Sequence, residues 1–219
     1  MVWIEKMNNK NSENHPFMHN FRPPWDEGPR KAFSALVENG RLKPGRLIEL
    51  GSGAARNAIF LAMHGFDVTG VDRDPALVAL ARKKVMAARV AAKFVVDDIT
   101  NLQNVTGPFD VLVDYSTFDD LTPEARDRYL QNVLPLTHPG SQFVLYCLEW
   151  TLSWWEKLTL QVLTRFGFGQ LTLEPGEVKR RFGEHFHIHK VAGETQKHNY
   201  PRGYAVYLMT RKATLSATA

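Results

Sequence analysis

Short apolar runs alternate with mixed polar segments along most of this chain. The apolar runs predict five buried strands, over residues 46–50, 66–71, 92–96, 109–114 and 142–148. Helices are predicted where a segment begins at a proline or capping residue or ends at a glycine, over residues 29–39, 54–64, 74–88 and 122–136. Strands that alternate with helices predict right-handed crossovers and a mainly parallel sheet covered on both faces.

The pattern changes after Leu148. Five aromatic residues gather in residues 149–170, which we interpret as an aromatic insert. Within the insert one apolar stripe recurs at helical spacing, at Leu152, Trp155, Thr159 and Val162. This stripe would suit three roles: covering the sheet, meeting a dimer partner, or closing a pocket as a lid.

Two further strands are predicted near the end of the chain, after a short helix over residues 175–182. They cover residues 185–191 and 203–210. The segment between them is too short for a crossover helix, so we expect them to pair as an antiparallel hairpin. His185, His187 and His189 alternate along the first of these strands, where side chains two apart lie about 6–7 Å from one another. We interpret them as a solvent-facing row and expect no metal site.

Length and composition favour one globular domain. The chain has 219 residues, of which 44% are hydrophobic, and its net charge of +4 is spread along the sequence. We therefore expect no nucleic-acid partner. Residues 1–20 predict a flexible tail, residues 21–212 the folded domain with its insert at 149–170, and residues 213–219 a second tail.

Signals for export, membrane insertion and disulfide formation are not found. The first residues are polar, and no apolar run approaches the roughly 20 residues that span a bilayer. We therefore expect a cytoplasmic protein without integral membrane contact. The single cysteine, Cys147, lies in an apolar run and predicts a buried thiol.

The first predicted strand leads into a turn that carries its own chemistry. The turn reads Glu49-Leu50-Gly51-Ser52-Gly53-Ala54-Ala55-Arg56, with an acid two residues before the first glycine. A pyrophosphate-binding turn would have a third glycine where Arg56 stands. A carboxylate at Glu49 would repel a pyrophosphate and would suit the ammonium group of an amino-acid-bearing cofactor. The two glycines let the backbone approach that cofactor closely.

Acidic residues close the next three predicted strands. Asp72 follows Gly51 by about 20 residues, the spacing from which a carboxylate accepts ribose hydroxyls. Asp97-Asp98-Ile99 could meet an adenine ring, with Asp98 at the amino group and Ile99 on the ring face. Asp114-Tyr115 closes the fourth strand. Since the carboxyl ends of parallel strands share one edge, we expect these groups to converge there.

These motifs resemble those of the class I S-adenosylmethionine-dependent methyltransferases, with the best match over residues 45–146. The stretch 55–62, with Pro24-Trp25-Asp26 upstream, is similar to the small-molecule branch that contains thiopurine and tellurite-resistance methyltransferases. The resemblance implies a Rossmann-like three-layer αβα sandwich with a seven-stranded, mostly parallel sheet and an antiparallel last strand. Ala55 stands where the family has its third motif glycine, which we expect to tighten the turn slightly without abolishing binding.

The resemblance also implies S-adenosyl-L-methionine as cofactor and a set of residues around it. The expected cofactor-binding residues are Trp25, Glu49, Gly51, Gly53, Arg56, Asp72, Arg73, Asp97, Asp98, Ile99 and Asp114. Asp114 and Tyr115 are the expected catalytic residues, because they are best placed to touch both ligands. Asp119 and Asp120 on the following loop are weaker candidates for a base, and Trp25 and Phe118 could wall the acceptor pocket.

The expected reaction is in-line displacement of a methyl group onto a small-molecule acceptor. Orientation of the two reactants would supply most of the acceleration, and a base is optional for a thiol or soft anion. A nicotinamide-dependent oxidoreductase is the alternative, disfavoured by Arg56 and Glu49. A protein that binds the cofactor without methyl transfer is a third reading. A homodimer is compatible with the aromatic insert.

Overall fold

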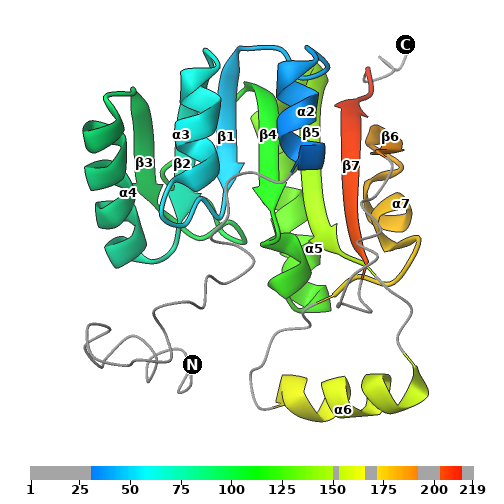
Figure 1. Cartoon of the computed structure of the whole chain (residues 1–219). Coiled ribbons are helices and arrows are strands. Elements are labelled where there is room, and N and C mark those ends of the chain that lie inside the picture. Colours follow the sequence, from blue (N-terminus) through cyan, green and yellow to red (C-terminus); the bar gives the residue numbers. More distant parts are fainter. Residues whose placement is uncertain (1–30, 150–152, 166–171, 192–202, 214–219) are drawn as a thin grey trace.

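The computed structural model describes residues 31–149, 153–165, 172–191 and 203–213. Their strands form one seven-stranded sheet in the order β3-β2-β1-β4-β5-β7-β6 (Figure 1). The strands are β1 (Arg46–Leu50), β2 (Asp67–Asp72), β3 (Ala92–Val96), β4 (Phe109–Tyr115), β5 (Thr137–Leu148), β6 (Phe186–Val191) and β7 (Tyr204–Arg211). Neighbours from β3 to β5 are parallel, whereas β7 runs antiparallel to both β5 and β6. The predicted fold class, with its antiparallel last strand, is confirmed.

Helices cover both faces of the sheet because alternate strand residues point to opposite sides. On one face pack α2 (Lys31–Glu38), α3 (Arg56–Met63) and α4 (Pro75–Ala88). On the other face pack α5 (Pro123–Val133) and α7 (Glu177–Phe182). Two short 3-10 helices, η2 (Phe118–Asp120) and η3 (Leu134–Leu136), flank α5. The result is the expected three-layer sandwich.

Local signals set several boundaries as predicted. Asp74 caps α4, because its carboxylate accepts a hydrogen bond from the Ala76 amide at 2.8 Å, and a proline follows in the first helical position. Thr122 caps α5 in the same way, by accepting from the Ala125 amide at 3.3 Å. The strands predicted over residues 46–50 and 92–96 match β1 and β3.

One boundary is wrong. Pro139-Gly140 predicts a turn before the fifth strand, but both residues lie inside β5. The pairing of β4 with β5 shifts from Phe109 opposite Thr137 to Val111 opposite Gln142, so β5 carries extra residues that bulge outward. Gly140 accommodates the bulge with a φ of 91°, and the Ser141 hydroxyl donates to the Phe109 carbonyl at 2.7 Å.

The aromatic insert contains α6 (Trp154–Arg165). Figure 1 shows α6 beyond the carboxyl ends of β4 and β5, apart from both helical layers. Trp155 is 62% exposed and Val162 is 50% exposed, so the predicted stripe does not cover the sheet. Leu152, its first member, lies outside the described residues. No helix among the described residues combines the length and apolarity that a membrane span requires.

The core next to α7 contains aromatic rings that pack edge to face. Phe143 of β5 is fully buried, and its ring centroid lies 5.8 Å from that of Phe182 and 6.1 Å from that of Phe186. We expect Phe143→Ala to lower the free energy of unfolding by about 3–5 kcal/mol, because it leaves a cavity that rigid neighbours cannot fill.

Urea denaturation followed by circular dichroism measures this effect. Met86→Ala is the control, since Met86 is 76% exposed on α4 and its truncation should change stability by only about 0.5 kcal/mol. Equal losses in the two variants would contradict this account of the core.

Candidate functional site

The turn after β1 is closely packed at Gly51 and open at Gly53. The Gly51 and Ser52 amides donate to the Val71 carbonyl at 2.8 and 2.9 Å, which ties the turn to the end of β2. Gly51 has a φ of 75°, and a Cβ there would lie 2.1 Å from the Thr117 hydroxyl oxygen. Gly53 has a φ of 50°, and a Cβ there would meet nothing within 4 Å. The turn thus lets the loop after β4 approach at Gly51 and presents bare backbone at Gly53.

Ala55 shows why a glycine would fit its position. Its φ is 67°, in the left-handed region, which costs a residue with a Cβ about 1–2 kcal/mol. Its amide donates to the Ser52 carbonyl at 3.1 Å, directly before α3 begins. The sequence located this departure, but its effect is backbone strain rather than the slight tightening that we expected.

Glu49 carries a buried polar atom that the turn does not satisfy, as does Ser52 through its hydroxyl. The side chain is 1% exposed, and its Oε1 accepts from the Asn57 side-chain amide at 2.9 Å. Its Oε2 is buried and has no hydrogen-bond partner within the described residues. Burial raises the pKa of Glu49 to about 8 against the opposing bond from Asn57, and the carboxylates of Asp114 and Asp72 push the pKa in the same direction as burial. A cation placed beside Oε2 would hold this group ionised.

Asp72, which we expect to accept ribose hydroxyls, lies against the glycine turn. One carboxylate oxygen accepts from the Gly53 amide at 2.8 Å, and the other accepts from the Asp74 amide at 2.9 Å. The side chain is half-buried, so its remaining lone pairs face the edge of the sheet. Arg73, the next residue, is exposed, and Arg56 is half-buried at the start of α3.

The two acids after β3 have different surroundings. Asp97 is buried and closes its own loop by accepting from the amides of Asp98, Gln103 and Asn104 at 2.9, 3.0 and 2.7 Å. Asp98 is exposed, and only its Oδ1 is engaged, by the amide and hydroxyl of Thr100. Ile99 is buried beside them. The geometry therefore gives Asp97 a role in shaping the loop and leaves Asp98 accessible to a ligand.

Asp114 is turned into the protein. It is 0% exposed; its Oδ1 accepts from the Thr117 and Phe118 amides at 2.9 and 3.2 Å, and its Oδ2 accepts from the Tyr129 hydroxyl at 2.8 Å. Burial raises its pKa to about 7, opposed by these bonds. Both oxygens are occupied by the loop and by α5, which does not support our expectation of direct contact with a ligand. Tyr129 is not among the residues that the sequence places at the site. Its position on the buried face of α5 is the signal that could have indicated it.

Tyr115 lies in an aromatic row. Its ring stacks on that of Tyr146 with centroids 4.4 Å apart and meets the edge of Phe33 at 6.0 Å. Tyr204 continues the row, 5.0 Å beyond Tyr146. Trp25 lies outside the described residues. Within the described residues, no three His, Cys, Asp or Glu side chains lie close enough together to hold a metal, and His187 and His189 are exposed on β6.

Comparison with known proteins identifies this arrangement. A model of the methyltransferase domain matches residues 47–140. The chain is 29% identical over 130 residues to 2-heptyl-1-hydroxyquinolin-4(1H)-one methyltransferase from Mycobacteroides abscessus, an alignment that covers 58% of this chain and 57% of that protein. The chain spans about half the length of the curated relatives it matches.

Solved structures share the fold across most of the chain. One, from work on the conversion of a disulfide bond into a thioacetal group during echinomycin biosynthesis, has a TM-score of 0.66 and 21% identity, covering 90% of this chain and 88% of that one. The Burkholderia thailandensis 1,6-didemethyltoxoflavin-N1-methyltransferase, with bound S-adenosylhomocysteine, has a TM-score of 0.62 and 18% identity, covering 84% and 77%.

These matches do not favour the oxidoreductase alternative, and they agree with the acid before Gly51 and with Arg56 in place of a third glycine. A methyltransferase domain thus matches residues 47–140, and over about half of its length the chain is similar to curated methyltransferases.

Proposed function

We propose that this protein transfers a methyl group from S-adenosyl-L-methionine to a small-molecule acceptor. Two observations in the same turn carry the proposal: within the described residues Oε2 of Glu49 is buried without a partner, and the backbone at Gly53 is open. An ammonium group would donate a hydrogen bond to that oxygen. The sugar or thioether chain of the cofactor would lie against Gly53, where a Cβ would have no neighbour within 4 Å. When bound, the cofactor supplies a methyl group already activated by its sulfonium centre.

The other edge residues fit the same cofactor. The half-buried Asp72 carboxylate would accept the ribose hydroxyls while it keeps its bond to the Gly53 amide. The free oxygen of exposed Asp98 would accept from the adenine amino group, and Ile99 would pack on the ring. We give Asp97 and Asp114 the task of fixing the loops that carry these contacts.

The class of acceptor follows from the state of the expected catalytic carboxylate. Both oxygens of Asp114 accept hydrogen bonds from the protein. Orientation must then supply most of the rate enhancement, and the acceptor should ionise without a strong base. We infer an acidic hydroxyl or thiol on a planar ring, in keeping with the heteroaromatic acceptors named for two related methyltransferases.

The direct test is a turnover screen. Purified protein and S-adenosyl-L-methionine would be incubated with 2-heptyl-1-hydroxyquinolin-4(1H)-one, an aromatic thiol, a catechol and an aliphatic amine, and S-adenosylhomocysteine would be measured. Product with the hydroxyl or thiol acceptors supports the proposal, whereas no product and no binding of the cofactor contradict it. A cytoplasmic location and a homodimer stay predictions of the sequence.

Gly53 offers a matched pair of variants. Gly53 and Gly140 both have positive φ, and a Cβ on either meets nothing within 4 Å. Both Gly53→Ala and Gly140→Ala place a Cβ at positive φ, with Gly140 further from the left-handed region at 91° against 50°, but only the first places a methyl group in the proposed cofactor space. We expect Gly53→Ala to weaken binding of S-adenosylhomocysteine at least about tenfold, or ~1.4 kcal/mol. Gly140→Ala should leave the affinity unchanged in calorimetry. Equal effects would show that strain, not occupied space, weakens binding.

Glu49 predicts a linked proton. Since its pKa is raised to about 8, the free protein holds the carboxyl largely protonated at pH 7. The ammonium group of the ligand favours the ionised form, so binding should release up to about one proton at pH 7 and almost none above pH 9. Affinity should accordingly rise with pH up to about 8.

Calorimetry of S-adenosylhomocysteine binding in buffers of different ionisation enthalpy measures that proton. Glu49→Gln is the control: it keeps an oxygen for Asn57 but has no proton to release. Proton release of equal size in both proteins would place the linked group elsewhere.

A further inference from the structure

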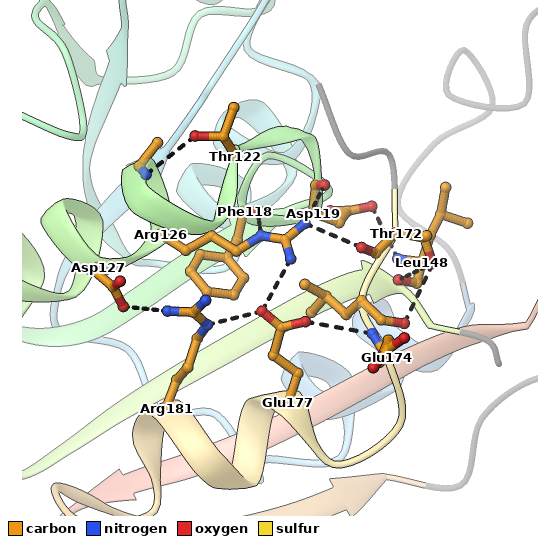
Figure 2. Close-up of polar contacts among 12 residues, drawn as sticks. Phe118, Asp119, Thr122, Arg126, Asp127, Leu148, Thr172, Glu174, Glu177 and Arg181 are labelled. Atoms are coloured by element: carbon orange, nitrogen blue, oxygen red, sulfur yellow. Dashed lines mark hydrogen bonds and ion pairs between the residues drawn. The ribbon is translucent and has the colours of Figure 1, made fainter. Parts of the chain in front are cut away.

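Arg126 on α5 is a buried charge whose contacts reach three separate segments (Figure 2). The side chain is 1% exposed. Its guanidinium donates to the carbonyls of Phe118 and Asp119 at 3.2 and 2.8 Å, to the carbonyl of Thr172 at 3.1 Å, and to the carboxylate of Glu177 at 3.0 Å. A planar fork suits this task, since its fixed N–H groups can bind several acceptors at once. One side chain therefore joins the loop after β4, the residues that follow the aromatic insert, and α7.

The near end of the insert is tied to the same loop. The Leu148 amide donates to Oδ2 of Asp119 at 3.0 Å, and the Ser116 hydroxyl donates to that oxygen at 3.0 Å. The two ends of the insert also meet, because the Leu173 amide donates to the Leu148 carbonyl at 2.8 Å. The base of the insert is thus a closed unit, held to the loop through Asp119 on one side and Arg126 on the other.

The base of the insert requires both the positive charge and the several N–H groups of an arginine at position 126. Glu177 lies almost fully buried against Arg126, and it also accepts from Arg181 at 2.8 Å. Burial alone would raise the pKa of Glu177, but the bond from Arg181 and the charge of Arg126 hold it below its ordinary value. A lysine at 126 would keep the charge but could not reach all the carbonyls that the fork binds.

The loop between β4 and α5 therefore has two attachments, which meet at Phe118: Asp114 binds its amide and Arg126 binds its carbonyl. Its near half is fixed by Asp114, which binds the Thr117 and Phe118 amides and the Tyr129 hydroxyl. This half packs on Gly51 of the cofactor turn. Its far half is fixed by Asp119 and Arg126 to the insert. Ser116, which precedes both attachments, has a φ of 63°, a strained conformation for a residue with a side chain.

We propose that Arg126 is a positioning residue for the acceptor side of the site, which it sets by holding the base of the insert against the loop after β4. This inference rests on the proposed function for its meaning. Arg126 touches neither ligand and acts through Asp119, Thr172 and the segment between β5 and α7.

The experiment compares Arg126→Lys with Tyr129→Phe, which loosens the other attachment. In the ligand-free protein, amide hydrogen exchange should accelerate about tenfold at Leu148 and Leu173 in Arg126→Lys, and at Thr117 and Phe118 in Tyr129→Phe. Binding of S-adenosylhomocysteine should stay within about twofold of wild type in Arg126→Lys and weaken in Tyr129→Phe. With 2-heptyl-1-hydroxyquinolin-4(1H)-one as probe, Arg126→Lys should raise the acceptor KM about tenfold and change kcat much less.

The outcomes separate this inference from the proposed function. Unchanged exchange at Leu148 and Leu173, or an equal loss of S-adenosylhomocysteine affinity in both variants, overturns the role of Arg126. If wild type binds the cofactor but does not methylate the probe, the inferred acceptor class fails, and the exchange and affinity measurements still decide the inference. If Arg126→Lys does not fold, Glu177→Gln, which keeps an oxygen for the guanidinium, is measured in its place with the same expectations.

Discussion

Close packing of the loop after β4 on the turn after β1 is the constraint on which the site depends. Thr117 occupies the space of a Cβ at Gly51, so the contact exists only because that residue is glycine. The loop keeps this position through Asp114, whose carboxylate is fully occupied by two loop amides and the Tyr129 hydroxyl. Since the turn also binds the end of β2 through the Val71 carbonyl, one contact aligns three strand ends at the same edge of the sheet.

The electrostatics of this edge differ from those of the network around Arg126. Glu49 and Asp114 are carboxyl groups buried close together, and burial raises both pKa values to about 8 and 7. Arg126 and Glu177 are buried together with opposite charges and full hydrogen bonding. A balanced buried pair fixes structure, because the loss of either member leaves an uncompensated charge. A buried carboxyl group without a positive partner instead favours a cationic ligand, because the ligand stabilises the ionised form.

The sequence predicted the sheet well because its strands are apolar and its helices have local caps, as at Asp74 and Thr122. It also predicted that Asp72 lies at the same edge of the sheet as the glycine turn, since strand ends in a parallel sheet share an edge. It failed where the outcome depended on distant partners. Asp114 turns inward because Tyr129 lies beneath it, and Pro139-Gly140 lies within β5 because Ser141 binds Phe109. Nothing in the local sequence around Arg126 indicates its contacts with residues 46 and 51 positions away.

The two attachments of the loop after β4 explain how one domain can bind one cofactor and different acceptors. The cofactor turn depends on Gly51, Thr117 and Asp114, all within or beside the central strands. The insert depends on Asp119, Arg126 and Glu177, which lie toward the sheet edge near α7. Since the residues that flank the insert bond to each other and to this loop, a change in the length or aromatic content of the insert would leave its base in place. Phe118 joins the two attachments, because Asp114 binds its amide and Arg126 binds its carbonyl, so the cofactor turn and the base of the insert are aligned through one residue.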